Sequence, residues 1–261
     1  MVQGPLGTRT ITMQRGKFIA LEGSDGAGKT TQLDLLVDYL AGSRKIPVLR
    51  LREPGGTVIG EEIRDLFKAK ELGAGMTAET ELLLVQASRA QLVRERIQPA
   101  LQQGIWVVCD RFLHSTLLYQ GYGRGLDPDM ITATTLFATG GLSPDLVLLL
   151  TLPQETARQR TQARAGTDRL EDEAVGFFSR VQQGVEALAA RSRRNPGGLV
   201  QAIDASQSIE EVHQEVVTAV MRRLGGTLVS TAPKLEINYE ELPVTSAHNI
   251  TTQDRSNGRP L

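Results

Sequence analysis

The stretch Gly23-Ser24-Asp25-Gly26-Ala27-Gly28-Lys29-Thr30 lies between a short apolar run and an amphipathic run. This order predicts a buried strand, a glycine-rich turn and the start of a helix. Glycines allow a tight turn with inward-pointing backbone N–H groups, and the helix adds the positive end of its dipole. Lys29 would supply a charge for a terminal phosphate and Thr30 a hydroxyl for Mg²⁺. The stretch therefore predicts a phosphate-binding loop, and the alternative is a plain glycine turn.

Strands and helices are expected to alternate along the chain. Short apolar runs predict strands at Lys17–Glu22, Pro47–Leu51, Ile105–Cys109, Asp145–Thr151 and Leu199–Ile203. Helical spacing of apolar residues predicts helices at Gln32–Leu40, Val58–Lys70 and Thr77–Gln103. This alternation is typical of an α/β fold, in which right-handed crossovers place helices on both faces of a parallel sheet. The sequence therefore predicts a five-stranded parallel sheet covered by helices on each side.

The length of 261 residues favours one large domain over two small ones. Residues 1–15 are polar and turn-rich, so we expect a flexible extension. The domain is expected at residues 16–224. Residues 225–261 form a polar tail that cannot bury enough apolar surface to order itself, so we expect it to be disordered.

Composition excludes several classes of partner and location. The formal net charge is −1, which gives no overall electrostatic attraction to nucleic acid or to an anionic membrane. No apolar run is long enough to span a bilayer, and the first residues lack the apolar centre of a signal peptide. Cys109 is the single cysteine, so an intramolecular disulfide is excluded. These features predict a cytoplasmic protein without a nucleic-acid or membrane partner.

Two further polar clusters follow predicted strands. Arg52-Glu53-Pro54-Gly55-Gly56 follows the second strand and Asp110-Arg111 the third. Carboxyl ends of parallel strands meet at one edge of a sheet, so these clusters are expected to converge on the phosphate-binding loop. Arg52 and Arg111 could each fork onto phosphate oxygens, or else form surface ion pairs. Asp110 could hold a metal or orient an acceptor, or else cap a helix.

A short polar stretch contains three arginines, Arg160, Arg164 and Arg169, around Gly166. Such a segment, at about 160–170, could close over a transferring phosphoryl group as a lid and exclude water. The alternative is a solvated, charged helix. The chain has no Asn/Thr-Lys-x-Asp segment of the kind that reads guanine, which argues against a GTPase switch.

Taken together, the motifs resemble those of thymidylate kinases over about Lys17 to Leu224. The resemblance rests on these segments: Glu22–Thr31, Arg52–Thr57, Ala87-Ser88-Arg89, Asp110-Arg111-Phe112, Ser115-Thr116, Tyr119-Gln120-Gly121 and Asp168-Arg169-Leu170-Glu171. It implies the three-layer P-loop kinase fold and transfer of the terminal phosphoryl group of ATP to dTMP, with Mg²⁺. Gly26, together with Arg164 and Arg169, resembles the bacterial subtype of this family.

The resemblance also implies roles for particular residues. Residues Gly23, Ser24, Asp25, Gly26, Ala27, Gly28, Lys29, Thr30 and Thr31 would bind ATP. Lys29, Arg111, Asp110, Arg164 and Arg169 would act in catalysis, and Thr30 and Asp110 would hold the metal. The acceptor would be bound by Asp25 at its 3′-hydroxyl, Arg52 and Arg111 at its phosphate, Arg89, Gln120 and Ser115 at the base, and Tyr119 at the deoxyribose.

The sequence departs from the family at the base. A phenylalanine that stacks on thymine usually precedes the Ala-Ser-Arg segment, and Val85 occupies that position. Phe67 and Phe112 are candidates to replace the missing ring. The tail beyond Leu224 is a second departure.

The resemblance implies a homodimer joined through packed helices. The apolar pattern Leu82–Leu101 is a candidate for the joining face, and its alternative is ordinary core. Two other functions stay open: another nucleotide or deoxynucleoside kinase of the same fold, and a regulatory module that binds nucleotide without turnover.

Overall fold

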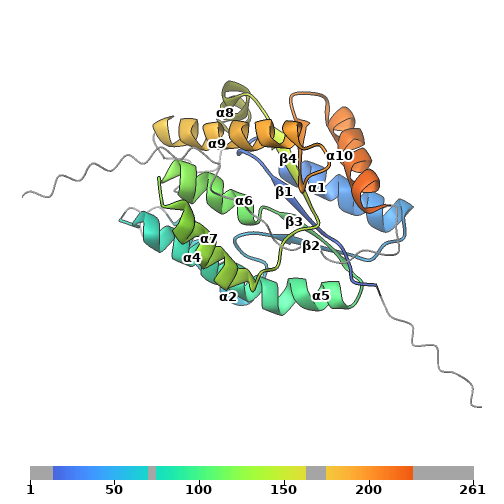
Figure 1. Cartoon of the computed structure of the whole chain (residues 1–261), viewed down its shortest axis with the longest axis horizontal. Coiled ribbons are helices and arrows are strands. Elements are labelled where there is room, and N and C mark those ends of the chain that lie inside the picture. The colour runs from blue at the N-terminus through green and yellow to red at the C-terminus, as the bar shows by residue number, and fades with distance from the viewer. Residues whose placement is uncertain (1–13, 70–74, 163–174, 226–261) are drawn as a thin grey trace, which may run out of the picture.

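Five parallel strands form a single sheet in the order β2-β3-β1-β4-β5 (Figure 1). The computed structural model describes residues 14–69, 75–162 and 175–225. The strands are β1 (Phe18–Glu22), β2 (Val48–Arg52), β3 (Trp106–Asp110), β4 (Leu146–Thr151) and β5 (Val200–Asp204). The ends of each strand differ from the predicted ends by at most one residue. The predicted α/β fold is confirmed.

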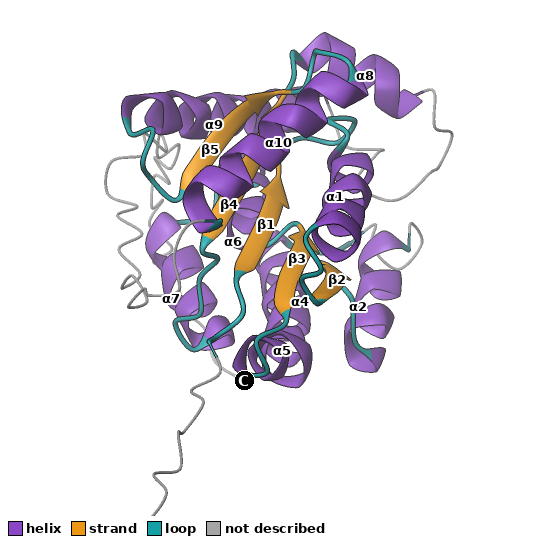
Figure 2. Ribbon diagram, turned by 90° about the vertical axis from the view of Figure 1, so that its right-hand side faces the viewer, coloured by secondary structure: helices purple, strands orange, loops and turns teal. Residues whose placement is uncertain are grey.

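Helices cover both faces of this sheet, which gives three layers (Figure 2). They are α1 (Lys29–Asp38), α2 (Val58–Lys68), α4 (Ala78–Leu92), α5 (Gln98–Gln102), α6 (Leu113–Thr116), α7 (Pro128–Thr139), α8 (Gln154–Gln162), α9 (Val175–Arg194) and α10 (Ile209–Leu224). The π-helical turn η2 (Val93–Ile97) joins α4 to α5, so the long helix predicted over 77–103 is confirmed. Two more π-helical turns, η1 (Tyr39–Ser43) and η3 (Leu117–Gly123), follow α1 and α6.

Strand β1 shows how the layers are held together. Its residues point alternately to opposite faces, and all are buried. Ile19 and Leu21 pack with α1 and α10, whereas Phe18 and Ala20 pack with the segment around Ile97. A strand that is apolar on both sides has no polar alternation, which is why the sequence of the central strands predicts burial on both faces.

The register of the sheet brings three strand ends together. Arg52 of β2 pairs with Asp110 of β3, and Asp110 pairs in turn with Leu21 of β1. Arg52 and Asp110 are thus the last residues of their strands. The sequence predicts instead that each is the first residue after its strand. The sheet itself therefore fixes where their side chains begin.

The predicted extension and tail lie almost wholly outside the described residues. Arg15, at the end of the extension, pairs with Asp145 at 3.1 Å. No helix within the described ranges has both the length and the apolar character needed to cross a membrane.

Candidate active site

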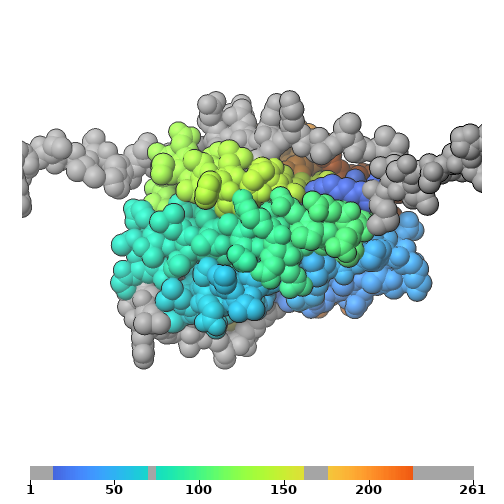
Figure 3. All heavy atoms as spheres, turned by 90° about the horizontal axis from the view of Figure 1, so that it is seen from below, coloured from blue at the N-terminus to red at the C-terminus, as the bar shows by residue number. Residues whose placement is uncertain are grey.

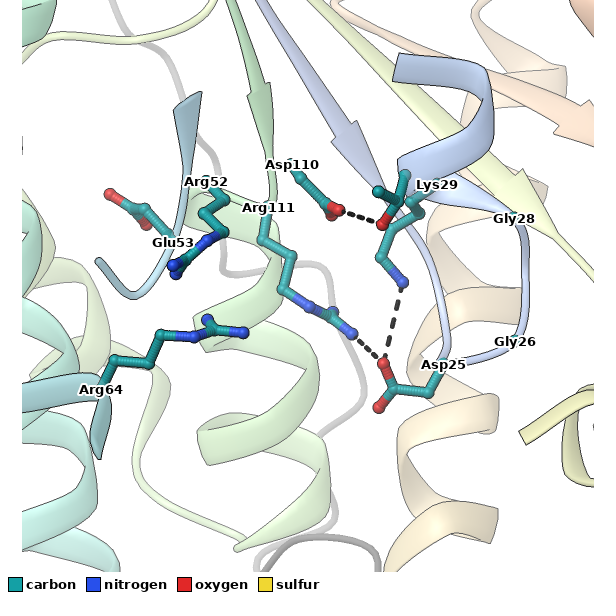
Figure 4. A pocket seen from close by; sticks show the side chains of 10 residues that line it. Asp25, Gly26, Gly28, Lys29, Arg52, Glu53, Arg64, Asp110 and Arg111 are labelled. Carbon is teal, nitrogen blue, oxygen red and sulfur yellow. Dashed lines mark hydrogen bonds and ion pairs between the residues drawn. The ribbon is translucent and has the colours of Figure 1, made fainter. Parts of the chain in front are cut away.

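One pocket opens at the carboxyl edge of the sheet (Figure 4). It is lined by Arg64 of α2 and by residues from all three of the polar clusters: Asp25, Gly26, Gly28, Lys29, Thr30, Arg52, Glu53, Asp110 and Arg111. The side chains of Arg52, Arg64, Arg111 and Lys29 reach into this pocket from β2, α2, the end of β3 and the start of α1. The predicted convergence of the three clusters is confirmed.

The glycine-rich turn runs close to neighbouring backbone. Gly23 has φ 135°, and a Cβ there would lie 2.3 Å from the carbonyl oxygen of Leu150 on β4. Gly26 has φ 80°, and a Cβ there would lie 2.6 Å from the carbonyl oxygen of Ala157 on α8. Larger residues at either position would push the turn away from the sheet or from α8, because backbone atoms cannot yield as a flexible side chain can.

Lys29 bends back over this turn and is almost fully buried. Its Nζ donates to the carbonyl oxygens of Ser24 at 2.8 Å and Gly23 at 3.2 Å, and lies 3.9 Å from Asp25. Burial and the nearby charge of Arg111 lower the pKa of Lys29 to about 8. Burial opposes ionisation of Asp25, but Arg111 and Lys29 outweigh it and lower the pKa of Asp25 to about 2. The turn thus holds a buried lysine beside a half-exposed carboxylate of opposite charge.

Arg111 is the centre of the polar contacts in the pocket. Its Nη1 donates to Ser115 Oγ at 3.2 Å and to the carbonyl oxygen of Gly23 at 3.3 Å. Its Nη2 pairs with Asp25 and donates to the Tyr119 hydroxyl, which itself donates to Asp25 at 2.8 Å. Arg111, Asp25, Tyr119 and Ser115 are therefore brought together, as the sequence predicts.

Glu22 holds the turn that carries Arg111, and sequence reasoning assigned it no role. The Glu22 carboxylate accepts from the backbone N–H of Phe112 at 2.8 Å, from the N–H of Ser115 at 3.2 Å and from Ser115 Oγ at 2.6 Å. Arg111 has φ 69°, in the left-handed region that side chains other than glycine rarely adopt. The Glu22 contacts to Phe112 and Ser115, which follow Arg111, stabilise that conformation. The signal was a carboxylate at the end of an otherwise apolar strand.

Two further arginines, Arg52 and Arg64, line the same pocket. Arg52 pairs with Glu61 of α2 at 2.8 Å, and Arg64 donates to the carbonyl oxygen of Pro54 at 2.9 Å. Burial and the neighbouring charge of Arg52 lower the pKa of Arg64. Arg64 was missed because it lies inside a predicted helix; its position about two turns into α2, after the Gly-rich segment, was the available signal.

Asp110 and Thr30 form a site that suits Mg²⁺. Thr30 Oγ1 donates to Asp110 Oδ2 at 2.8 Å, while Asp110 Oδ1 is buried and has no hydrogen-bond partner in the described part of the chain. Among the described residues there is no cluster of three or more His, Cys, Asp or Glu side chains that could hold a metal. Mg²⁺ commonly binds one or two protein oxygens, with phosphates and water completing its shell. The donor set therefore fits this ion.

Arg89 and Gln120 are buried side chains that do not line the pocket. Arg89 is 1% exposed, and all five of its N–H donors are used: by Glu53 twice, and by Gln86, Thr116 and the carbonyl oxygen of Phe112. Gln120 is 2% exposed and donates to Glu81. Contact between Arg89 and a base would require one of these hydrogen bonds to be exchanged.

The missing aromatic ring is not replaced by Phe112. Phe112 is fully buried, packs edge-on against Phe18 at 4.8 Å and lies beneath the Arg89 guanidinium at 5.3 Å. Phe67 is 6% exposed on α2, and Val85 is 7% exposed on α4. Neither phenylalanine lines the pocket.

The predicted lid falls mostly outside the described residues, which exclude Arg164 and Arg169. Arg160 lies within α8 and donates to the carbonyl oxygen of Ala205 at 3.1 Å.

The chemistry of the pocket suits two phosphorylated ligands. Lys29 and the glycine-rich turn provide one anion site, and the arginines at positions 52, 64 and 111 provide another a short distance away. Arginine can hold phosphate oxygens in pairs, and a buried lysine can meet a terminal phosphate. No described group is placed between them as an obvious nucleophile, so the arrangement favours phosphoryl transfer between ligands by positioning and charge neutralisation.

Comparisons with known proteins agree on one family. A family model described as "Thymidylate kinase" matches residues 21–216. The chain is 46% identical over 206 residues to thymidylate kinase of Synechococcus sp. RCC307, covering 77% of this chain and 94% of the relative. It is 44% identical over 214 residues to that of Methylococcus capsulatus, covering 82% and 99%. Thymidylate kinase from Ehrlichia chaffeensis superposes with TM-score 0.62 at 32% identity, covering 79% of this chain and 99% of that structure.

Proposed function

Because the chain belongs to the thymidylate kinase family, we propose that the pocket of Figure 4 is where its reaction takes place. The reaction transfers the terminal phosphoryl group of ATP to dTMP, giving dTDP and ADP, so the enzyme is a nucleoside monophosphate kinase. The observation that carries the assignment is that Lys29, Arg52 and Arg111, from three separate segments, line one pocket.

The glycine-rich turn is the donor site in this proposal. Backbone N–H groups of residues 23–31 and the start of α1 would hold the ATP phosphates. Lys29 already lies over the turn, and its charge would meet the transferring group as negative charge moves away from ATP. The buried position of Lys29 strengthens this interaction, because less water screens it.

The arginines would bind the acceptor. Arg111 and Arg52 would hold the dTMP phosphate, joined by Arg64, which lines the same pocket. A phosphate monoester is mostly ionised at neutral pH, so it needs orientation and charge neutralisation more than a general base. Asp25 would accept a hydrogen bond from the 3′-hydroxyl of dTMP. Tyr119, whose hydroxyl donates a hydrogen bond to Asp25, would lie beside the deoxyribose.

Mg²⁺ would be held by Thr30 and Asp110, where it would neutralise charge on the phosphates of ATP. The unpartnered, buried Oδ1 of Asp110 and the adjacent Thr30 hydroxyl support this assignment.

Roles for Arg164 and Arg169 in the lid remain proposals from the sequence, since both lie outside the described residues. A cytoplasmic location is likewise proposed, on the single buried thiol of Cys109, which fits a reducing compartment.

A panel of acceptors tests the proposal against its two alternatives. Purified protein is incubated with ATP, Mg²⁺ and one nucleoside monophosphate or deoxynucleoside at a time, and ADP and the phosphorylated product are measured. We expect dTDP from dTMP as the preferred reaction. Preference for another acceptor would favour a different kinase of this fold, and nucleotide binding without product would favour the regulatory module.

The lowered pKa of Lys29 predicts a pH dependence. With a pKa of about 8, Lys29 is charged below that pH and becomes neutral as the pH rises through it. The kcat/KM for ATP reports the free enzyme, so it should fall as the pH passes 8. The same profile in Lys29→Arg, whose guanidinium stays charged, should not show that fall. A flat profile through pH 8 in the unaltered enzyme would contradict the assignment of Lys29 as the charge that meets ATP.

Restoring the missing ring should strengthen acceptor binding. Stacking of an aromatic side chain on a base contributes about 1–3 kcal/mol, so Val85→Phe should lower the Kd for dTMP about fivefold or more. Calorimetric titration measures this, with ADP as the control ligand, because ADP binding should not change. Unchanged or weaker dTMP binding would mean that the space above the base is already filled.

A second proposal concerns oligomeric state. The helices α2, α4 and α7 pack side by side and form one face of the molecule, shown in cyan, teal and yellow-green in Figure 3. Of the eight exposed large hydrophobic residues in the described ranges, seven lie on these helices: Val58, Ile59, Leu66, Leu83, Met130, Leu136 and Phe137. The pattern Leu82–Leu101 instead supplies mainly core, including Leu92, Ile97 and Leu101. The joining face is thus proposed on three helices rather than along that one segment.

Breaking this face should separate the subunits. Phe137 is 85% exposed, so Phe137→Glu should leave the fold intact while placing a charge at the centre of an apolar contact. Sedimentation velocity should show the unaltered protein at twice the mass of the chain and the variant at the mass of one chain. Ile209→Glu, an exposed apolar residue on α10, is the control and should remain dimeric. A monomeric unaltered protein would overturn the proposed homodimer.

A further inference from the structure

A row of buried side chains along α4 faces the segment that carries Gln120. Glu81, Val85 and Arg89 follow at intervals of four residues, so they lie on one side of the helix and span about 12 Å. Glu81 contacts Gln120 of η3, and Arg89 contacts Thr116 just before it. Val85 lies between the two, at the position where the family usually stacks a ring on the base.

Glu81 is held firmly in place. It is fully buried, and its Oε2 accepts from Arg124 Nη2 at 2.8 Å and from Arg124 Nε at 3.2 Å. The Arg124 guanidinium lies 4.5 Å above the ring of Phe177. The other oxygen, Oε1, accepts from Gln120 Nε2 at 2.7 Å. The ion pair thus fixes the carboxylate that meets the Gln120 amide.

The chemistry of a carboxylate decides which way this amide points. A charged carboxylate accepts hydrogen bonds and cannot donate them, so Gln120 must turn its NH2 group toward Glu81. Its carbonyl oxygen, Oε1, then faces the other way, and nothing in residues 14–69, 75–162 or 175–225 donates to it. Gln86 differs, because its two amide atoms are engaged by Arg89 at 2.9 Å and Thr135 at 2.7 Å.

We propose that Glu81 is a specificity-determining residue: it orients Gln120 so that an acceptor oxygen, and not an NH2 group, meets the base of the substrate. This inference rests on the proposed function and on the role that the resemblance to thymidylate kinases implies for Gln120, which is contact with the thymine edge. Thymine and uracil carry an N–H at position 3, which donates to such an oxygen. Cytosine carries a lone pair there, which repels it. Glu81 therefore favours dTMP and dUMP over dCMP.

Glu81→Gln tests this directly, because an amide can donate as well as accept and so permits Gln120 to turn over. Dissociation constants of dTMP, dUMP and dCMP are measured by calorimetry. We expect the preference for dTMP over dCMP to fall about tenfold or more, because Gln120 can then turn its NH2 group to the lone pair of cytosine and replace a repulsion by a hydrogen bond. The preference for dTMP over dUMP should stay within about twofold, because both bases present the same N–H.

Two control variants separate orientation from packing and charge. Glu79→Gln makes the same substitution at an exposed position of α4 and should keep the selectivity of the unaltered protein. Arg124→Lys weakens the ion pair but leaves the carboxylate to accept from Gln120, so it too should keep the preference for dTMP. Equal weakening of all three nucleotides by Glu81→Gln, or loss of selectivity in Arg124→Lys, would overturn the inference.

A measurement on the unaltered protein covers the case in which Glu81→Gln does not fold. In ¹⁵N-labelled protein, the side-chain NH2 protons of Gln120 should be protected from solvent exchange, and saturation with dTMP should leave that protection unchanged. Loss of protection on binding dTMP would mean that the NH2 group leaves Glu81, which contradicts the proposal. If the unaltered protein does not phosphorylate dTMP, the proposed function fails; if it does and Glu81→Gln keeps full selectivity, only this inference fails.

Discussion

Arg111→Ala should reduce kcat/KM for dTMP by about 10³-fold or more. Arg111 contacts Asp25, Tyr119, Ser115 and the Gly23 carbonyl, so it links the acceptor side of the pocket to the glycine-rich turn. Its removal takes away the charge that would hold the acceptor phosphate and leaves Asp25 facing that phosphate with less compensation. The terminal phosphate of ATP and the phosphate of dTMP would then have to approach each other with one cation fewer to neutralise their charge.

Steady-state kinetics with dTMP as the varied substrate measure this effect. Arg193→Ala, an exposed arginine near the end of α9, is the matched control and should leave the rate unchanged. ADP binding by Arg111→Ala, measured separately, should remain within about tenfold of the parent, because the donor turn is still formed. Activity of Arg111→Ala within tenfold of the parent would remove this arginine from the reacting centre.

Lys29→Ala should cost a similar factor, about 10³-fold, but on the donor side. The Lys29 ammonium is buried and lies over the turn that would carry the ATP phosphates. Its loss should lower kcat and kcat/KM for ATP together, since the charge acts most strongly where negative charge moves during transfer. Binding of dTMP should change much less, because Arg52, Arg64 and Arg111 remain.

Comparing Lys29→Ala with Arg111→Ala therefore tests whether the pocket is divided into a donor half and an acceptor half. Lys45→Ala, at an exposed lysine before β2, serves as the charge-matched control. Initial rates with ATP varied at saturating dTMP give the donor effect, and the reverse experiment gives the acceptor effect. If both variants weakened the same substrate, the division of the pocket into donor and acceptor halves would be wrong.

Much of the fold followed from local patterns. The apolar run of β4 is buried because helices cover both faces, and burial on both faces is what an unbroken apolar run indicates. The spacing of Gly, Lys and Thr placed the turn before α1 correctly, since that backbone conformation depends on local residues. The role of the Leu82–Leu101 pattern could not be decided in this way, because core and interface residues share the same helical spacing.

The site was predictable where residues follow strand ends and less so elsewhere. Lys29, Arg52 and Arg111 converge because the parallel sheet aligns the ends of β1, β2 and β3. Arg64 comes from the middle of a helix, and its direction depends on how α2 packs. Glu81 meets Gln120 across 39 positions of sequence, a pairing that no spacing rule predicts.

The central claim is that two nucleotides bind end to end, with their phosphates between the glycine-rich turn and the arginines. A compound in which adenosine and thymidine are joined 5′ to 5′ through five phosphates tests it most directly. Its Kd, measured by calorimetric titration and by displacement of ADP and dTMP, should be about 10²-fold or more below that of either nucleotide, since one molecule would occupy both halves. Displacement of only one nucleotide, or binding no tighter than the better of the two, would contradict the account.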